Sequence, residues 1–85
     1  MFKAGDLVMA TVNEGDITGD HFIKDKHEIR GKIAVDEAPD SGVEEGYVQM
    51  TISQMRPIPP AGHGGYDWAS AKGLITVRRS CVTRW

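Results

Sequence analysis

Three histidines and the acidic residues near two of them are the side chains that could bind a divalent metal. Imidazole nitrogens and carboxylate oxygens are ordinary metal ligands. Their spacing, however, matches neither His-Glu-x-x-His nor the alternating acidic positions of a calcium-binding loop. We therefore expect no metal and no cofactor, and we interpret these residues as solvated loop side chains: His21, His27, His63, Asp20, Asp25 and Glu28.

Cys81 is the only cysteine and the strongest candidate nucleophile. Thiol catalysis needs an adjacent base and a group that orients that base. Cys81 falls in an expected strand, where a free cysteine usually behaves as a small apolar side chain. The segment His63-Gly64-Gly65 is similar to an oxyanion loop, but no Gly-x-Ser-x-Gly turn accompanies it. The sequence therefore predicts a protein that is not an enzyme.

A glycine-rich segment with aromatic neighbours precedes the arginines of the C-terminal end. Its aromatic side chains could stack on a nucleobase or another planar ligand, while the arginines bind its phosphate or carboxylate groups. The alternative is a flexible connector that Trp68 anchors in the core. One hypothesis is therefore a sponge-like binder of a small ligand or nucleotide, with these ligand-binding residues: His63, Tyr66, Trp68, Arg78, Arg79 and Arg84.

Direct binding of nucleic acid is a further hypothesis, because the chain ends in a basic stretch. Lys72 and the three arginines accompany Trp85 there. Arg78 and Arg79 would point to opposite sides of a strand, so they would not share one patch. The isoelectric point of about 5.8 also lies below the basic values typical of dedicated nucleic-acid binders. A protein partner is the stronger expectation.

Five carboxylates fall within residues 36–45, and they define the leading hypothesis. Such a stretch can imitate phosphates and occupy a basic groove of a partner. The alternative is a solvated hairpin loop. In style the chain resembles a small phage-type inhibitor or accessory protein. We expect a non-enzymatic module that binds a protein partner and inhibits or regulates it through these residues: Asp36, Glu37, Asp40, Glu44 and Glu45.

Composition and length limit the classes of protein to consider. The 85 residues predict a single domain over residues 1–85, with a small core. One cysteine cannot form an internal disulfide, which argues against a secreted scaffold. Neither a signal peptide nor an apolar run long enough to span a bilayer is evident. A cytoplasmic protein with no membrane partner is therefore expected, and a homo-oligomer stays open.

Ten glycines and four prolines divide the chain into short apolar segments, a pattern typical of all-β domains. Apolar and polar residues alternate most clearly in 27–36 and 47–53, which predicts an antiparallel hairpin with a bulge or bend at Gly31. The three prolines of 56–60 predict an extended spacer outside the sheet or, less simply, a Pro-x-x-Pro ligand. Residues 67–73 predict one helical turn.

These elements favour a small five-stranded SH3-like barrel with long loops and one short helical turn. The expected strands are 6–12, 27–36, 47–53, 74–79 and 81–85. The opening segment Lys3–Val8 resembles the start of many such barrels, where a Gly-Asp turn leads into the first strand. The expected core residues are Leu7, Met9, Ile29, Ile33, Val35, Val48, Met50, Ile52, Leu74, Ile75 and Val77.

Overall fold

The protein is all-β, and a computed structural model describes residues 1–19, 21–59 and 65–85. Its seven strands form one antiparallel sheet: β1 (Leu7–Val12), β2 (Ile17–Thr18), β3 (His27–Ile33), β4 (Tyr47–Pro57), β5 (Ala69–Ser70), β6 (Leu74–Arg78) and β7 (Val82–Arg84). The only helical elements in this part of the chain are two 3-10 turns, η1 (Glu14–Asp16) and η2 (Arg79–Cys81). Neither turn is long enough to span a membrane.

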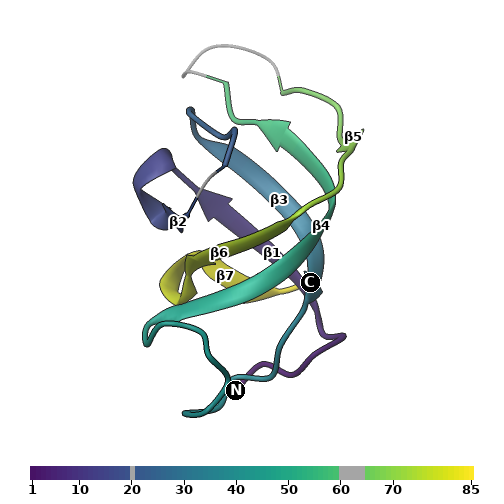
Figure 1. Cartoon of the computed structure of the whole chain (residues 1–85). Helices are drawn as coiled ribbons and strands as arrows, with labels where there is room; N and C mark the ends of the chain where they lie inside the picture. Colours follow the sequence, from purple (N-terminus) through teal and green to yellow (C-terminus); the bar gives the residue numbers. More distant parts are fainter. Residues whose placement is uncertain (20, 60–64) are drawn as a thin grey trace.

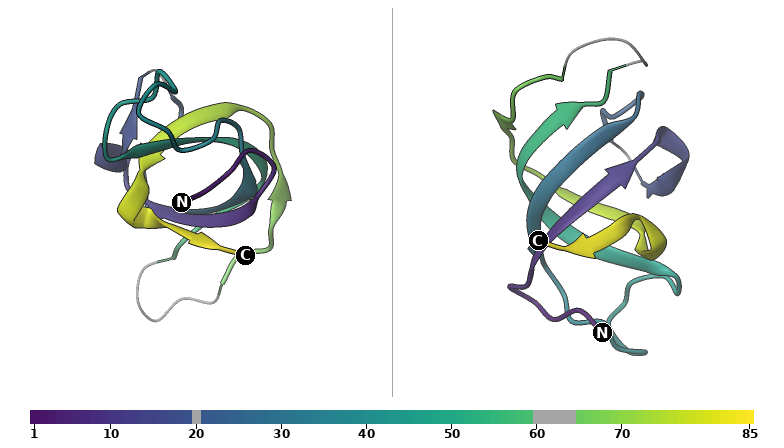
Figure 2. Two further views of the ribbon diagram at one scale, coloured as in Figure 1. Left: turned by 90° about the horizontal axis from the view of Figure 1, so that it is seen from below. Right: turned by 180° about the vertical axis from the view of Figure 1, so that it is seen from behind.

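The strands follow the order β2-β6-β4-β3-β1-β7, with β5 pairing only with β4 (Figure 1). Seen from one end, the sheet curls round the core and the N-terminal segment crosses the opening (Figure 2). All five expected strands are present, and the two additional strands have two residues each, but Cys81, expected in the last strand, lies in η2. Because the order begins at β2 and ends at β7 with no pairing between them, the sheet is not closed.

The predicted hairpin is confirmed as β3 and β4, and its irregularity lies at Gly31. The partner of β3 steps from Ile52, opposite Gly31, to Gln54, opposite Arg30, so Ser53 is an extra residue on β4. A Cβ on Gly31 would lie 1.9 Å from the carbonyl oxygen of Thr51. Only glycine therefore allows the two backbones to approach this closely.

The core is formed by the inward faces of the strands, with Phe2 and Ile23 added from the loops. In β1, Val8, Ala10 and Val12 point inward, because alternate residues of a strand point to the same face. The buried hydrophobic residues are Phe2, Val8, Ala10, Val12, Ile17, Ile23, Ile29, Ile33, Val48, Met50, Ile52, Ile75, Val77 and Val82.

Four expected core residues lie elsewhere. Leu7 and Leu74 are exposed, because each precedes an inward-facing residue on its strand and so points outward. Met9 shares the outward face of β1 and is half-buried. Val35 follows the end of β3 and belongs to the next loop. Only one face of β1 is therefore buried, and the expected core positions Leu7 and Met9 lie on the other face.

The helical turn predicted for residues 67–73 is also wrong. Instead, Ala69 and Ser70 form β5 against β4. The backbone N–H of Ala71 donates to Ser53 O at 3.1 Å, and that of Ile52 donates to Gly73 O at 2.8 Å. The extra residue in β4 thus offers this segment backbone partners that a single helical turn would leave unused.

The proline-rich segment begins inside the sheet and not after it. Arg56 pairs with Glu28 and Pro57 with His27 at the end of β4. The N–H of Ile58 donates to Lys26 O at 2.9 Å, so the nitrogen of Pro57 points to the opposite side. No described strand pairs with Pro57 on that side. The sheet therefore loses no hydrogen bond through the missing N–H of Pro57.

Candidate functional site

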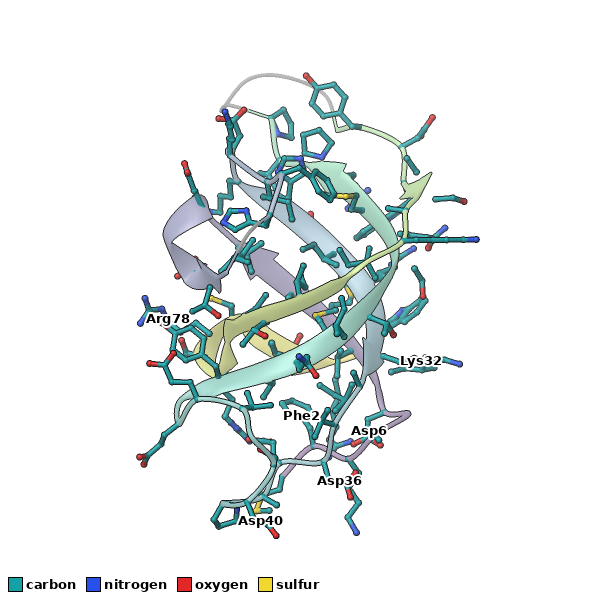
Figure 3. The ribbon with its side chains drawn as sticks, viewed as in Figure 1. Phe2, Asp6, Lys32, Asp36, Asp40 and Arg78 are labelled. Atoms are coloured by element: carbon teal, nitrogen blue, oxygen red, sulfur yellow. The ribbon has the colours of Figure 1, made fainter. Side chains whose placement is uncertain are left out.

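The acidic stretch forms a loop, residues 34–46, between β3 and β4, with Asp36 and Asp40 at the same end of the molecule as Phe2 (Figure 3). A turn closed by the Ser41 N–H on Ala38 O at 3.1 Å begins at Ala38, with Pro39 at its second position. Gly46 adopts a φ of 85°, which turns the chain into β4.

A pocket of about 450 Å³ opens between this loop and the start of β4. We call it the loop pocket. Its lining is mixed, because apolar side chains alternate with the acidic residues Asp36, Glu37 and Glu45. The remaining lining residues are Met1, Val35, Ala38, Pro39, Ser41, Val43, Tyr47, Val48 and Gln49. A lining of apolar side chains and carboxylates suits a side chain that is part hydrocarbon and part cation.

Two of the five predicted partner-binding carboxylates hold the N-terminal segment. The backbone N–H of Phe2 donates to Glu37 Oε1 at 2.6 Å, and that of Ala4 donates to Asp36 Oδ1 at 2.7 Å. Glu37 Oε2 also accepts from Arg79 Nε at 2.7 Å. Asp36 and Glu37 therefore hold the N-terminal segment in place while also lining the loop pocket.

The other three predicted carboxylates face solvent. Asp40, Glu44 and Glu45 are exposed, and none forms an ion pair with any residue that the structure describes. Glu45 also lines the loop pocket. Figure 3 shows Asp40 at the tip of the loop, beyond Asp36 and on the same end as Asp6. Within the described part of the chain, Glu45 therefore brings an unpaired carboxylate to the pocket itself, and Asp40 and Glu44 add unpaired carboxylates elsewhere on the same loop.

Carboxylates of this end and of η1 have lowered pKa values. The Arg79 guanidinium and the N–H of Phe2 lower the pKa of Glu37. The N–H of Lys3 lowers the pKa of Asp6, with Arg84 adding to the effect. The N–H of Asn13 and the side chain of Arg78 do the same for Asp16. In each case the hydrogen bonds stabilise the ionised carboxylate, and this effect outweighs burial, which alone would raise the pKa.

These shifts predict a protein that acid destabilises. Because these pKa values are lower in the folded protein, the unfolded chain binds protons at a higher pH than the folded one. The stabilisation from the three carboxylates is therefore complete above about pH 5 and is lost as the pH falls through their folded-state pKa values. Urea denaturation between pH 7 and pH 2 measures this. Glu37→Gln should lower the midpoint at pH 7 and reduce its fall in acid, whereas exposed Glu44→Gln should change neither. An equal acid response in both variants would contradict the assignment.

The structure brings only two of the three predicted ligand-binding arginines together, and all three bind acidic side chains. Arg78 donates to Asp16 Oδ1 at 3.2 Å and lies over the ring of Tyr47. Arg79 binds Glu37, as described above. Arg84 donates to Asp6 Oδ2 at 3.1 Å. Each arginine thus pairs with a carboxylate of its own chain. Arg79 and Arg84 both lie against the ring of Phe2, whereas Arg78 lies apart from them over Tyr47.

The aromatic half of that predicted site has different partners. Trp68 lies against Arg30 and Arg56, and the backbone oxygen of Tyr66 accepts from Arg56 Nη1 at 3.3 Å. His63 lies outside the described residues. Sequence reasoning missed Arg30 and Arg56. The alternation of 27–36 does show that Arg30 points outward, because its neighbour Ile29 points into the core. Trp68 is half-buried against these arginines and is absent from the core.

The remaining reactive side chains are Cys81 and the histidines. Burial and the nearby Asp16 carboxylate raise the pKa of the Cys81 thiol, so the thiol stays protonated at neutral pH. The Nδ1 atom of His27 lies 2.7 Å from Asp25 O. Within the described ranges, no three histidine, cysteine or acidic side chains gather as metal ligands would.

Comparison with known proteins gives no relative. The chain matches no protein-family model, no curated protein and no solved structure.

Proposed function

We propose that the protein is a non-enzymatic binding module whose loop pocket takes a basic segment of a protein partner. The observation that carries this proposal is the set of three exposed carboxylates, without ion pairs among the described residues, on the loop that forms a mixed pocket of about 450 Å³. An apolar side chain of the partner enters the pocket, and its neighbouring lysine or arginine meets Glu45, Glu44 or Asp40. Charge selects the partner and speeds the encounter, while apolar burial slows its departure.

The consequence for the partner is inhibition or regulation, as for a phage-type inhibitor acting in the cytoplasm. A basic groove that normally binds phosphates would be occupied by carboxylates instead. The internal use of Asp36 and Glu37 supports this reading, because those hydrogen bonds fix the base of the loop. A loop fixed at its base loses less conformational entropy on binding than a free one.

We propose further that the curled sheet is an SH3-like barrel. Without the two-residue strands, the order is β7-β1-β3-β4-β6, so the first of the five main strands lies between the second and the last. The turn η2 leads directly into that last strand. Both features support an SH3-like arrangement. The fold serves here as a scaffold and carries no argument about the partner.

Charge reversal at the pocket tests the proposed function. The protein is immobilised and incubated with an extract of its own cells. The partner proteins that it retains are quantified by mass spectrometry. Exposed ion pairs contribute about 0.2–1 kcal/mol each, so Glu44→Lys with Glu45→Lys should weaken binding about tenfold or more. The control is Glu14→Lys with Asp25→Lys, two exposed positions outside the pocket with the same change of net charge. Equal recovery by both double variants would overturn the proposal.

A further inference from the structure

Arg30 is the one arginine in the described structure without a carboxylate partner. The other four, Arg56, Arg78, Arg79 and Arg84, each form an ion pair with an acidic side chain. The guanidinium of Arg30 lies 3.9 Å from the ring centroid of Trp68 and 5.0 Å from that of Trp85. Its Nε is shielded from solvent and has no hydrogen-bond partner among the described residues. Both tryptophans of the chain thus hold one uncompensated cation.

Arg30 lies on a continuous outward face formed by β1 and β3. Met9 lies opposite Arg30 across β1 and β3, and Leu7 lies opposite Lys32. The N–H of Trp85 donates to Leu7 O at 3.1 Å, which fixes the last residue of the chain beside these strands. Leu7 and Trp85 are 49% and 54% exposed. We call Arg30, Lys32, Trp68 and Trp85 the tryptophan–arginine face.

This face is separate from the loop pocket. None of its four residues lines the pocket. In Figure 3, Lys32 projects from one side of the sheet, whereas Arg78 lies on the other side and Asp36 and Asp40 lie at the lower end. The molecule therefore presents a cationic, aromatic surface on its side and an acidic one at its end. The two surfaces call for ligands of opposite charge.

We infer that the tryptophan–arginine face binds a single-stranded nucleic acid. A half-exposed indole offers a stacking surface to an unpaired base, and such stacking tolerates any sequence. Arg30 and Lys32 stand next to the stacking surface, where successive phosphates of the strand would lie. The two indoles already hold the Arg30 guanidinium, so little side-chain freedom is lost when a phosphate binds. An acidic peptide would match the charge but would leave the exposed ring of Trp85 without a planar partner.

Tryptophan fluorescence locates binding directly, because both tryptophans of the chain belong to this face. The probe is an oligothymidylate of about ten nucleotides, within the usual site size for one small barrel. We expect it to quench the emission of the wild-type protein. We also expect the logarithm of affinity to fall with the logarithm of salt concentration, with a slope of about −0.7 for each phosphate contacted.

Variants measured with a dye-labelled oligothymidylate by anisotropy complete the test. Arg30→Gln and Trp85→Ala should each weaken binding about tenfold, whereas Lys24→Gln, which removes one exposed charge from the loop before β3, should leave affinity within about twofold. Arg30→Lys keeps the charge and should bind with intermediate affinity. Thermal melts show which variants fold, and the wild-type quenching stands independently of them.

Three results would overturn the inference. The first is no quenching by the oligothymidylate in about 50 mM salt, where electrostatic binding is strong. The second is a folded Arg30→Gln protein with unchanged affinity. The third is an oligoglutamate of the same length that quenches as strongly as the oligonucleotide, since that would show an acidic protein segment to be the ligand. Failure of any kind here leaves the loop pocket and its charge-reversal test unaffected.

Discussion

Replacing Gly31 with alanine will destabilise the protein by about 3 kcal/mol or more, because the new methyl group has no room. Its carbon would lie 1.9 Å from Thr51 O and 3.0 Å from Thr51 C, both backbone atoms. A flexible side chain could move aside, but here β3 and β4 must separate. These two strands form the most extensive pairing in the sheet, so the damage reaches the whole core.

Urea denaturation followed by circular dichroism measures this loss. A small domain has an m value of about 1 kcal/mol per molar urea, so the midpoint should fall by about 3 M or the variant should be unfolded without urea. Gly15→Ala is the matched control, since a Cβ there meets no atom within 4 Å and the residue does not have a positive φ. A Gly31→Ala midpoint within about 0.5 M of that control would contradict the close approach.

Phe2→Ala should cost about 3 kcal/mol or more, the usual range for truncating a buried phenylalanine. Phe2 is the buried residue of the N-terminal segment and is only 6% exposed. The guanidinium groups of Arg79 and Arg84 lie 5.1 and 5.2 Å from its ring centroid. The substitution removes the apolar contact that holds this segment across the end of the sheet. It also removes the attraction of the Phe2 ring for the two guanidinium groups.

The control for Phe2 is leucine, which keeps an apolar side chain of similar size without an aromatic ring. Phe2→Leu should lose about 1–2 kcal/mol, made up of imperfect packing and the two cation–π contacts. Denaturation midpoints of the three proteins give the comparison. If Phe2→Ala and Phe2→Leu were equally and only slightly destabilised, Phe2 would not be the anchor of this segment.

Local patterns in the sequence predicted most of the sheet. Alternation gave the positions of the main strands, and the glycine inside an alternating segment indicated the irregularity at Gly31. Residues 67–73 show where such patterns fail. Asp67 and Gly73 are ordinary helix-terminating residues, but the unpaired backbone of β4 beside Ser53 offered stronger partners. A pattern within one segment carries no information about which neighbour will supply hydrogen bonds.

The candidate sites likewise differ in how far the sequence could predict them. The acidic loop could be predicted because its carboxylates are close in sequence. The use of Asp36 and Glu37 could not, since their partners Ala4, Phe2 and Arg79 lie 32 to 42 residues away. Nor could the tryptophan–arginine face, which joins β3 to the segment before β5 and to the end of the chain. Such contacts depend on how the sheet curls, which no local pattern determines.

The most direct test of the loop pocket is an amide-shift titration of ¹⁵N-labelled protein by NMR. The probe is a short peptide in which lysine and arginine alternate with leucine, added in physiological salt. We predict saturable shifts for amides of residues 35–49 and of the N-terminal segment, and their loss in Glu44→Lys with Glu45→Lys. Shifts centred on Trp68 and Trp85, or no shifts at all, would contradict the proposal that this pocket receives a basic segment.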